Sequence, residues 1–140
     1  MQIRSARKTP PTRAAFFFVA LTLAGCASSP DVFEQNRRQA ARDWRTPEAK
    51  AYASAFYPAI GQDLANLLKK CTADFPRDEI DTFDLVFRID HWGEPKAVVA
   101  NPVTDVSNCV AQGFWYFTFP HPDKRFEKTG MAMLMPISIR

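Results

Sequence analysis

The hydrophobic period of this chain changes from that of a helix to that of a strand, which restricts it to folds that pack helix against sheet. Before the change, apolar residues recur every three or four positions, at Tyr52, Phe56, Ile60, Leu64, Leu67, Leu68 and Cys71. After the loop Thr72 to Asp81 they alternate, at Phe83, Leu85, Phe87 and Ile89. The first pattern predicts an amphipathic helix that packs on a core, and the second a half-buried strand.

The start of the helix is also visible in the sequence. Thr46 offers a capping hydroxyl, Pro47 suits the first helical position, and Glu48 lies near the positive end of the helix dipole. Pro58 interrupts the hydrogen-bond ladder without changing the phase of the apolar stripe. We therefore expect a kink there, or two nearly collinear helices.

The stretches after the first strand predict a β-β-α-β order. Asp90 to Glu94 contains Gly93 and turns the chain, so that Pro95 to Val103 returns as the second strand of an antiparallel hairpin. Asp105 or Ser107 can cap the helix that follows. With the earlier helix, this order gives an α+β fold with a small antiparallel sheet.

The last predicted strand carries its apolar residues on one face. These residues are Met131, Met133, Met135, Ile137 and Ile139. Pro136 has no backbone donor, which places this strand at a sheet edge or at a bulge.

The N-terminal part of the chain has the layout of an export signal. Four basic residues and no acidic residue precede the apolar run 14–24, whose eleven residues are too few for a membrane-spanning helix, which needs about 20. The run ends in Leu23-Ala24-Gly25-Cys26, which resembles the lipobox of bacterial lipoprotein precursors. The resemblance implies that residues 1–25 are removed and that Cys26 is acylated with fatty acids such as palmitate. Because Ala27 stands where an Asp would retain such a protein in the inner membrane, it also implies the periplasmic face of the outer membrane.

Removing the signal changes the charge balance of the chain. Residues 26–140 carry 14 basic and 15 acidic side chains, so the basicity of the whole sequence belongs to the signal and gives no reason to expect a nucleic-acid partner. We expect a lipidated tether and arm over 26–45 and a single domain over 46–140. The arm contains Arg37, Arg38 and Arg42 but too few apolar residues to define a buried face, and its Trp44 packs on the domain or lies near lipid headgroups.

Two cysteines remain once Cys26 is assigned to the lipid. Cys71 and Cys109 then form an even pair in an oxidising compartment, which predicts a disulfide. A metal or redox site is disfavoured, because neither cysteine belongs to a Cys-x-x-Cys motif or stands beside a histidine.

The second half of the domain resembles the TonB C-terminal domain and its relatives in gliding-motility and adventurous-motility proteins. The resemblance covers about residues 81–139 and rests on Leu85-Val86-Phe87-Arg88-Ile89-Asp90, Gly93, Val98, Val99, Cys109 and Phe117-Thr118-Phe119-Pro120. Phe117 replaces the Trp that is usual in those relatives. TonB also has an inner-membrane helix and a Pro-rich spacer that this sequence lacks, so the resemblance implies the fold but not energy transduction.

The sequence offers few groups for catalysis. His91 and His121 have no partner recognisable from spacing, Ser107 and Ser138 lack a nucleophile-elbow context, and no glycine-rich loop could hold a phosphate. The acidic residues Asp74, Asp78, Glu79, Asp81 and Asp84 match no calcium loop. We therefore expect no catalytic residue, no cofactor and no metal.

Two functional classes remain. The favoured one is a non-catalytic, membrane-anchored module that meets an envelope protein by strand addition at a sheet edge, at the Met-rich last strand or at the hairpin. The alternative is a small-ligand-binding protein or enzyme whose site brings His91, Trp92 and His121 together at one end of the sheet. The aromatic residues between 114 and 119 are expected in the core.

Overall fold

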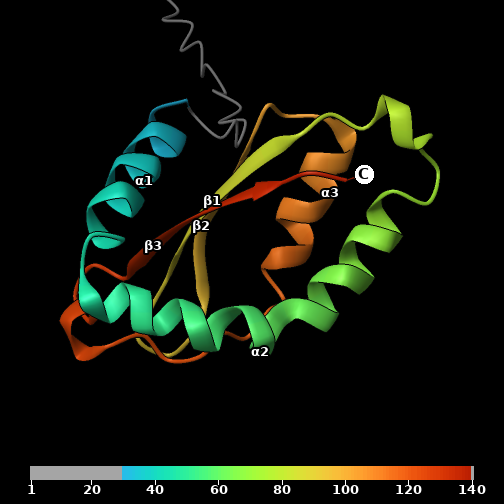
Figure 1. Cartoon of the computed structure of the whole chain (residues 1–140). Helices are drawn as coiled ribbons and strands as arrows, with labels where there is room; N and C mark the ends of the chain where they lie inside the picture. Colours follow the sequence, from blue (N-terminus) through green and yellow to red (C-terminus); the bar gives the residue numbers. More distant parts are fainter. Residues whose placement is uncertain (1–29, 140) are drawn as a thin grey trace, which may run out of the picture.

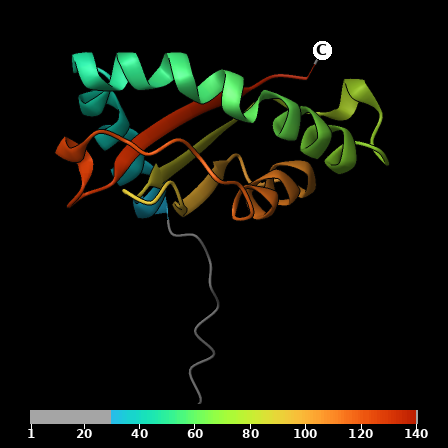
Figure 2. The ribbon, with the colours of Figure 1, turned by 90° about the horizontal axis from the view of Figure 1, so that it is seen from below.

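A computed structural model describes residues 30–139, and the signal segment and Cys26 lie outside them. Three helices surround a three-stranded antiparallel sheet in the order β2-β1-β3, which makes the chain an α+β protein. Helix α1 (Pro30–Asp43) lies on one face of the sheet, and α3 (Asp105–Phe114) lies on the other, as Figure 1 shows. Helix α2 (Pro47–Cys71) runs across the end of this arrangement (Figure 2). None of the helices described is long and apolar enough to cross a membrane.

Helix α2 begins where the sequence predicts. The Thr46 hydroxyl accepts a hydrogen bond from the backbone N–H of Ala49, and Pro47 is the first helical residue. The helix continues through Pro58 as a single element and bends along its length in Figures 1 and 2. The predicted stripe faces the core: Tyr52, Phe56, Ile60 and Cys71 are buried, and the leucines between them pack at its margin.

The sheet is built on the central strand β1 (Phe83–Ile89), as the alternating pattern predicts. It forms an antiparallel hairpin with β2 (Pro95–Asn101) and pairs on its other side with β3 (Met131–Ile137). Strand β2 ends at Asn101, two residues earlier than expected, because Pro102 has no N–H to continue the ladder. The position of β3 at an edge confirms what Pro136 suggested.

Helix α1 packs on the sheet, although its sequence predicted an arm without a buried face. Phe33 forms a small core with Val86 and Val99, and Ala40 is also buried. Asn36 supplies the polar part of this contact: its side-chain amide is fully buried and donates to the carbonyl oxygen of Ala97 at 3.0 Å. The helix is therefore part of the folded domain. Trp44, which follows it, packs against the main core.

Helix α3 is capped by Thr104, not by Asp105 or Ser107 as the sequence suggested. The Thr104 hydroxyl accepts from the Ser107 N–H, and the Ser107 hydroxyl accepts from the Thr104 N–H, which forms a capping box. Ser107 is fully buried and also donates to the Pro102 carbonyl oxygen at 2.8 Å. This serine has a structural role.

Gly93 joins the hairpin turn to the segment after α3. Its φ of +81° lies in the left-handed region, and its carbonyl oxygen accepts from the Phe119 N–H at 2.9 Å. A Cβ at this position would collide with the Phe119 carbonyl oxygen. The approach brings Gly93 and Phe119, 26 positions apart in the sequence, into contact at one end of the sheet.

Tyr52 should make the fold sensitive to alkaline pH. Its side chain is buried, its hydroxyl donates to the Pro120 carbonyl oxygen at 2.7 Å, and burial raises the pKa of the phenol above its ordinary value. The unfolded chain releases this proton near pH 10, while the folded chain keeps it, so the contribution to stability is intact below about pH 10 and is lost as the pH rises further.

The measurement is urea unfolding of the wild type and Tyr52→Phe between pH 7 and pH 11. At pH 7 the free energy of unfolding of Tyr52→Phe should be about 1 kcal/mol below that of the wild type, because the variant lacks the hydrogen bond. Above pH 10 this difference should become smaller, because only the wild type is destabilised by ionisation of Tyr52. Tyr57→Phe, at a half-exposed tyrosine of the same helix, is the control and should follow the wild type. A constant gap over the whole pH range would contradict the prediction.

Candidate functional site

The edge formed by β3 offers little to a partner, although it was the first choice from the sequence. Met131, Met133 and Met135 are buried in the main core, so the Met-rich face is an internal surface. The Ala132 N–H points away from β1 and donates to the Asp43 carboxylate at 2.9 Å, and Pro136 has no N–H. An incoming strand would therefore find most of the outward donors of this edge occupied or absent.

The edge formed by β2 is different, and the strand register shows why. Because the Ala132 N–H points away from β1, Arg88 and Ala132 are a non-hydrogen-bonded pair of the ladder. Hydrogen-bonded and non-hydrogen-bonded pairs alternate along antiparallel strands, so Leu85, three positions before Arg88, directs its N–H and C=O toward β3. Ala100, which lies opposite Leu85 on β2, therefore turns its N–H and C=O outward. Ala100 is 6% exposed and lies between the bulge at Ala97 and Pro102, so a strand that arrives at this edge has the outward groups of this one residue to pair with.

An apolar groove runs beside this open edge. It has a volume of about 390 Å³ and lies between β2 and the exposed side of α3. Its walls are Val98, Val99, Ala100 and Val103 from β2 and the residues that follow it, and Asn108, Ala111, Gln112 and Trp115 from α3 and its end. The sequence did not predict this groove, because its two walls come from elements whose contact is set by tertiary packing.

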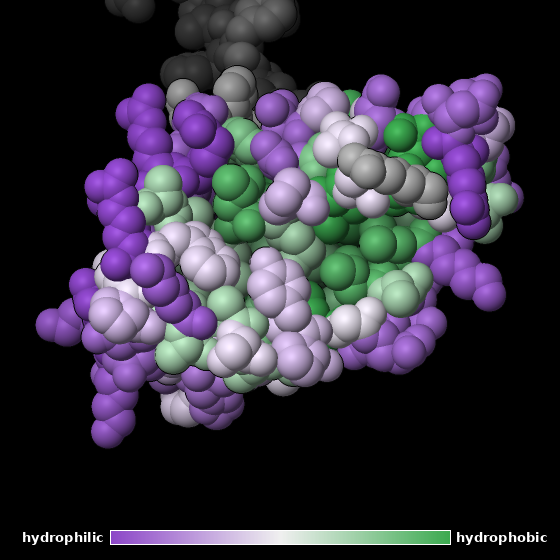
Figure 3. All heavy atoms as spheres, viewed as in Figure 1, coloured by the Kyte–Doolittle hydropathy of each residue, from purple (hydrophilic) through white to green (hydrophobic). Residues whose placement is uncertain are grey.

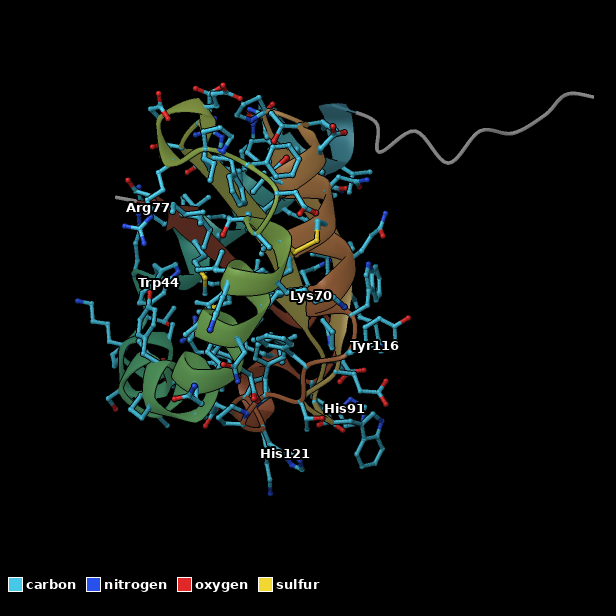
Figure 4. The ribbon with its side chains drawn as sticks, turned by 90° about the vertical axis from the view of Figure 1, so that its right-hand side faces the viewer. Trp44, Lys70, Arg77, His91, Tyr116 and His121 are labelled. Carbon is cyan, nitrogen blue, oxygen red and sulfur yellow. A yellow bond between two sulfur atoms is a disulfide. The ribbon has the colours of Figure 1, made fainter. Side chains whose placement is uncertain are left out.

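The aromatic residues at the end of α3 divide between core and surface. Phe114 and Phe119 are buried and Phe117 is half-buried, as expected. Trp115 and Tyr116 are exposed, at 49% and 90%, where the sequence predicted core positions. Figure 4 shows the Tyr116 side chain projecting from the molecule. The helix ends at Phe114, so these two side chains point outward, and Trp115 closes one end of the groove.

Two of the three residues of the alternative site line one hollow. His91 and His121 line one hollow of about 320 Å³ together with Pro122, Lys124 and Glu127, and Figure 4 shows both histidines at the same end of the molecule. Trp92 does not line this hollow: it is 63% exposed, and its ring centroid lies 4.1 Å from that of His91. The close contact of Gly93 with the Phe119 segment brings the two histidines together.

The charged groups with shifted pKa values stabilise local structure. Desolvation opposes the ionisation of Asp90, but hydrogen bonds from the Glu94 and Trp92 N–H groups, with Lys96 nearby, hold the pKa of its carboxyl below its usual value. This carboxylate orders the hairpin turn. Within residues 30–139, no three His, Cys, Asp or Glu side chains come together to hold a metal, and the acidic residues from Asp74 to Asp81 are exposed.

The structure places the sulfur atoms of Cys71 and Cys109 at bonding distance, which confirms the predicted pair. The bond joins the last residue of α2 to the middle of α3, with the two Cα atoms 5.7 Å apart. It therefore fixes the helix that forms one wall of the groove.

A second apolar surface lies at the C-terminal end of α2. Figure 3 shows hydrophobic side chains gathered over the end of α2, the following loop and the end of β3. Leu68, Phe75 and Ile139 are among the residues that line this hollow, with Lys69 and Arg77 at its border.

No protein-family model, curated protein sequence or solved structure matches this chain.

Proposed function

We propose that this protein is a non-catalytic lipoprotein of the bacterial envelope, anchored through Cys26, that binds an extended segment of another envelope protein along β2. The observation that carries the proposal is the open edge of β2 beside the apolar groove. The outward N–H and C=O of Ala100 can pair with the backbone of an incoming strand, and the groove can receive its side chains. The β-β-α-β order agrees with a domain that resembles the TonB C-terminal domain.

The groove suggests the chemistry of the partner segment. Its lining is mostly aliphatic, with Trp115 at one end and the amides of Asn108 and Gln112 on the rim. Side chains alternate across a strand, so every second residue of the bound segment would face the groove. We infer a segment with small or aliphatic residues at alternate positions and no charge among them.

Photo-crosslinking in cells tests the binding part of this proposal. A photoreactive amino acid in place of Gln112, on the rim of the groove, should form adducts that mass spectrometry maps to one extended stretch of a single envelope protein. Ala100→Pro removes the outward N–H without breaking a bond to β1 and should abolish the adduct. Val103→Asp places a charge at a groove position that is 69% exposed, and it should do the same without disturbing the core.

The control replaces Gln62, an exposed residue of α2, with the same photoreactive amino acid. Adducts from position 62 should differ from those at position 112 and should not respond to Ala100→Pro or Val103→Asp. Adducts at position 112 that survive both variants while the protein stays folded would contradict binding at the β2 edge.

Fractionation of the same cells tests the anchor. The wild type should sediment with membranes, and Cys26→Ser should move to the soluble fraction because it lacks the acyl chains. A Cys26→Ser protein that remains with the membranes would contradict the lipid anchor. Binding at the groove would then still be tested by the crosslinking experiment.

The hollow between His91 and His121 supports a second candidate, a small-ligand site at the opposite end of the domain from the disulfide. The meeting of the only two histidines of the chain in one hollow favours it. His91→Ala and His121→Ala should leave partner crosslinking at position 112 unchanged if the two sites are independent, and a loss in either variant would contradict binding by the β2 edge alone.

A further inference from the structure

The outer face of α1 carries a row of arginines that the groove and the histidine hollow do not use. Arg38 and Arg42 are four positions apart on the helix, and Arg45 follows three positions later. All three are exposed; Arg38 and Arg42 lie on the side of the helix opposite the buried Phe33 and Asn36, and Arg45 lies in the turn that follows the helix. We call these three residues the arginine row.

The arginine row has no ion-pair partner among the side chains that the structure describes. No carboxylate of residues 32–139 forms an ion pair with any of the three guanidinium groups. Of the two nearest acids along the helix, Glu34 pairs with Arg37 at 2.8 Å, and its pKa is lowered by Arg37 and, more weakly, by Arg38; Asp43 accepts from the Ala132 N–H.

The rest of the domain does not share this excess of positive charge. Residues 30–139 carry 13 basic and 15 acidic side chains, so the row is a local concentration on a domain that is slightly acidic. Figure 3 shows hydrophilic side chains gathered over α1. A concentrated positive surface of this kind is attracted to an anionic one.

The sequence distance from Cys26 to α1 limits what can lie against this row. Helix α1 begins at Pro30, four positions after the proposed lipid anchor, and four residues span at most about 14 Å. Arg38 lies a further 12 Å or so along the helix, so a lipid anchor at Cys26 would keep the row close to the membrane surface. Anionic headgroups attract basic side chains by about 1 kcal/mol each within a Debye length of the surface.

We propose that Arg38, Arg42 and Arg45 bind anionic phospholipid headgroups and orient the domain on the membrane. This inference rests on the proposed anchor at Cys26. Because α1 and α3 cover opposite faces of the sheet (Figure 1), contact through α1 turns the groove beside α3 away from the lipid. The groove is then accessible to a partner in the periplasm.

Reconstitution of the protein purified from membranes tests the proposal. A photoreactive amino acid replaces Gln35, which lies on α1 beside Arg38, and the protein is inserted into two kinds of vesicle. One contains phosphatidylcholine alone, and the other contains about one third phosphatidylglycerol. Lipid adducts should be about tenfold more abundant in the anionic vesicles, and 0.5 M NaCl should remove most of this difference.

Charge variants separate the arginine row from general charge. Arg38→Gln, Arg42→Gln and Arg45→Gln together should reduce adducts in anionic vesicles to the level in neutral ones, and the three Arg→Lys changes should preserve them. Lys50→Gln, Lys69→Gln and Lys70→Gln together make the same change of charge on exposed positions of α2 and should have no effect. Equal adducts in both vesicles, or full adducts in the Arg→Gln variant, would overturn the proposal.

Flotation of the same vesicles distinguishes failure of the arginine-row proposal from failure of the proposed lipid anchor at Cys26. An anchored protein floats with neutral vesicles, whereas a protein without acyl chains does not. If the protein floats with neither kind of vesicle, both the anchor and the arginine row are excluded. Flotation with anionic vesicles alone, lost in the Arg→Gln variant, would support the arginine row and exclude the anchor.

Discussion

Replacing both Cys71 and Cys109 with alanine is expected to lower the free energy of unfolding by about 4 kcal/mol. The bond closes a loop with a sequence separation of 38 residues, and in the chain-entropy model a cross-link of this length restricts the unfolded chain by that amount. Small domains are stable by only about 5–15 kcal/mol, so much of the stability should depend on this bond.

Urea unfolding followed by circular dichroism measures the effect. The wild type in a reducing agent is the control, because it loses the cross-link while keeping both sulfur atoms in place. Reduced wild type and the double variant should unfold at similar, much lower urea concentrations than the oxidised protein. Equal midpoints for oxidised wild type and double variant would show that the bond does not stabilise the fold.

The bond should also matter for binding at the groove. Cys109 lies on α3, whose exposed side forms one wall of the groove, and the bond holds this helix to the end of α2. Reduction should therefore weaken crosslinking from position 112 before it unfolds the domain. The same disulfide therefore contributes both to the stability of the domain and to the shape of the groove.

Local patterns in the sequence predicted the elements of the fold but not the contacts that form the site. The 3.6-residue period from Tyr52 to Cys71 and the alternation from Phe83 to Ile89 are repeated in adjacent residues, so they predicted α2 and β1 correctly. Helix α1 was missed as a packed element because one of its buried positions is Asn36, a polar residue. The bulge in β2 presents the Ala97 carbonyl oxygen to the Asn36 amide N–H, a tertiary contact that satisfies the donor but leaves the Asn36 Oδ1 without a partner.

The candidate sites depend even more on contacts between distant segments, which local sequence patterns do not show. The groove needs β2 beside α3, and the histidine hollow needs the turn at Gly93 beside Phe119, and both are contacts between segments separated in the sequence. The structure makes β3 a less favourable edge than β2, which the sequence could not show because a period of 2 does not tell which face of a strand is internal. The buried methionines and the hydrogen bond from Ala132 to Asp43 decide it.

Phe87→Ala is expected to destabilise the domain by about 3–5 kcal/mol, the usual cost of removing a fully buried phenylalanine. Phe87 lies on the central strand, and its ring centroid is 6.3, 5.2 and 5.6 Å from those of Phe56, Phe114 and Phe119. One side chain thus connects β1 to α2, to α3 and to the segment after α3. Removing it leaves a cavity that three separate elements would have to move to fill.

Thermal and urea unfolding of Phe87→Ala measure this cost, with Phe75→Ala as the matched control at a phenylalanine that is 37% exposed. The control should cost less, about 1–2 kcal/mol, because Phe75 packs beside Leu68 and Ile139 but keeps 37% of its surface exposed. Because Phe114 immediately precedes Trp115, loss of Phe87 should also loosen the end of α3 and weaken crosslinking from position 112. A Phe87→Ala protein as stable as Phe75→Ala would mean that the aromatic cluster does not hold the helices to the sheet, and the groove would then lack a rigid wall.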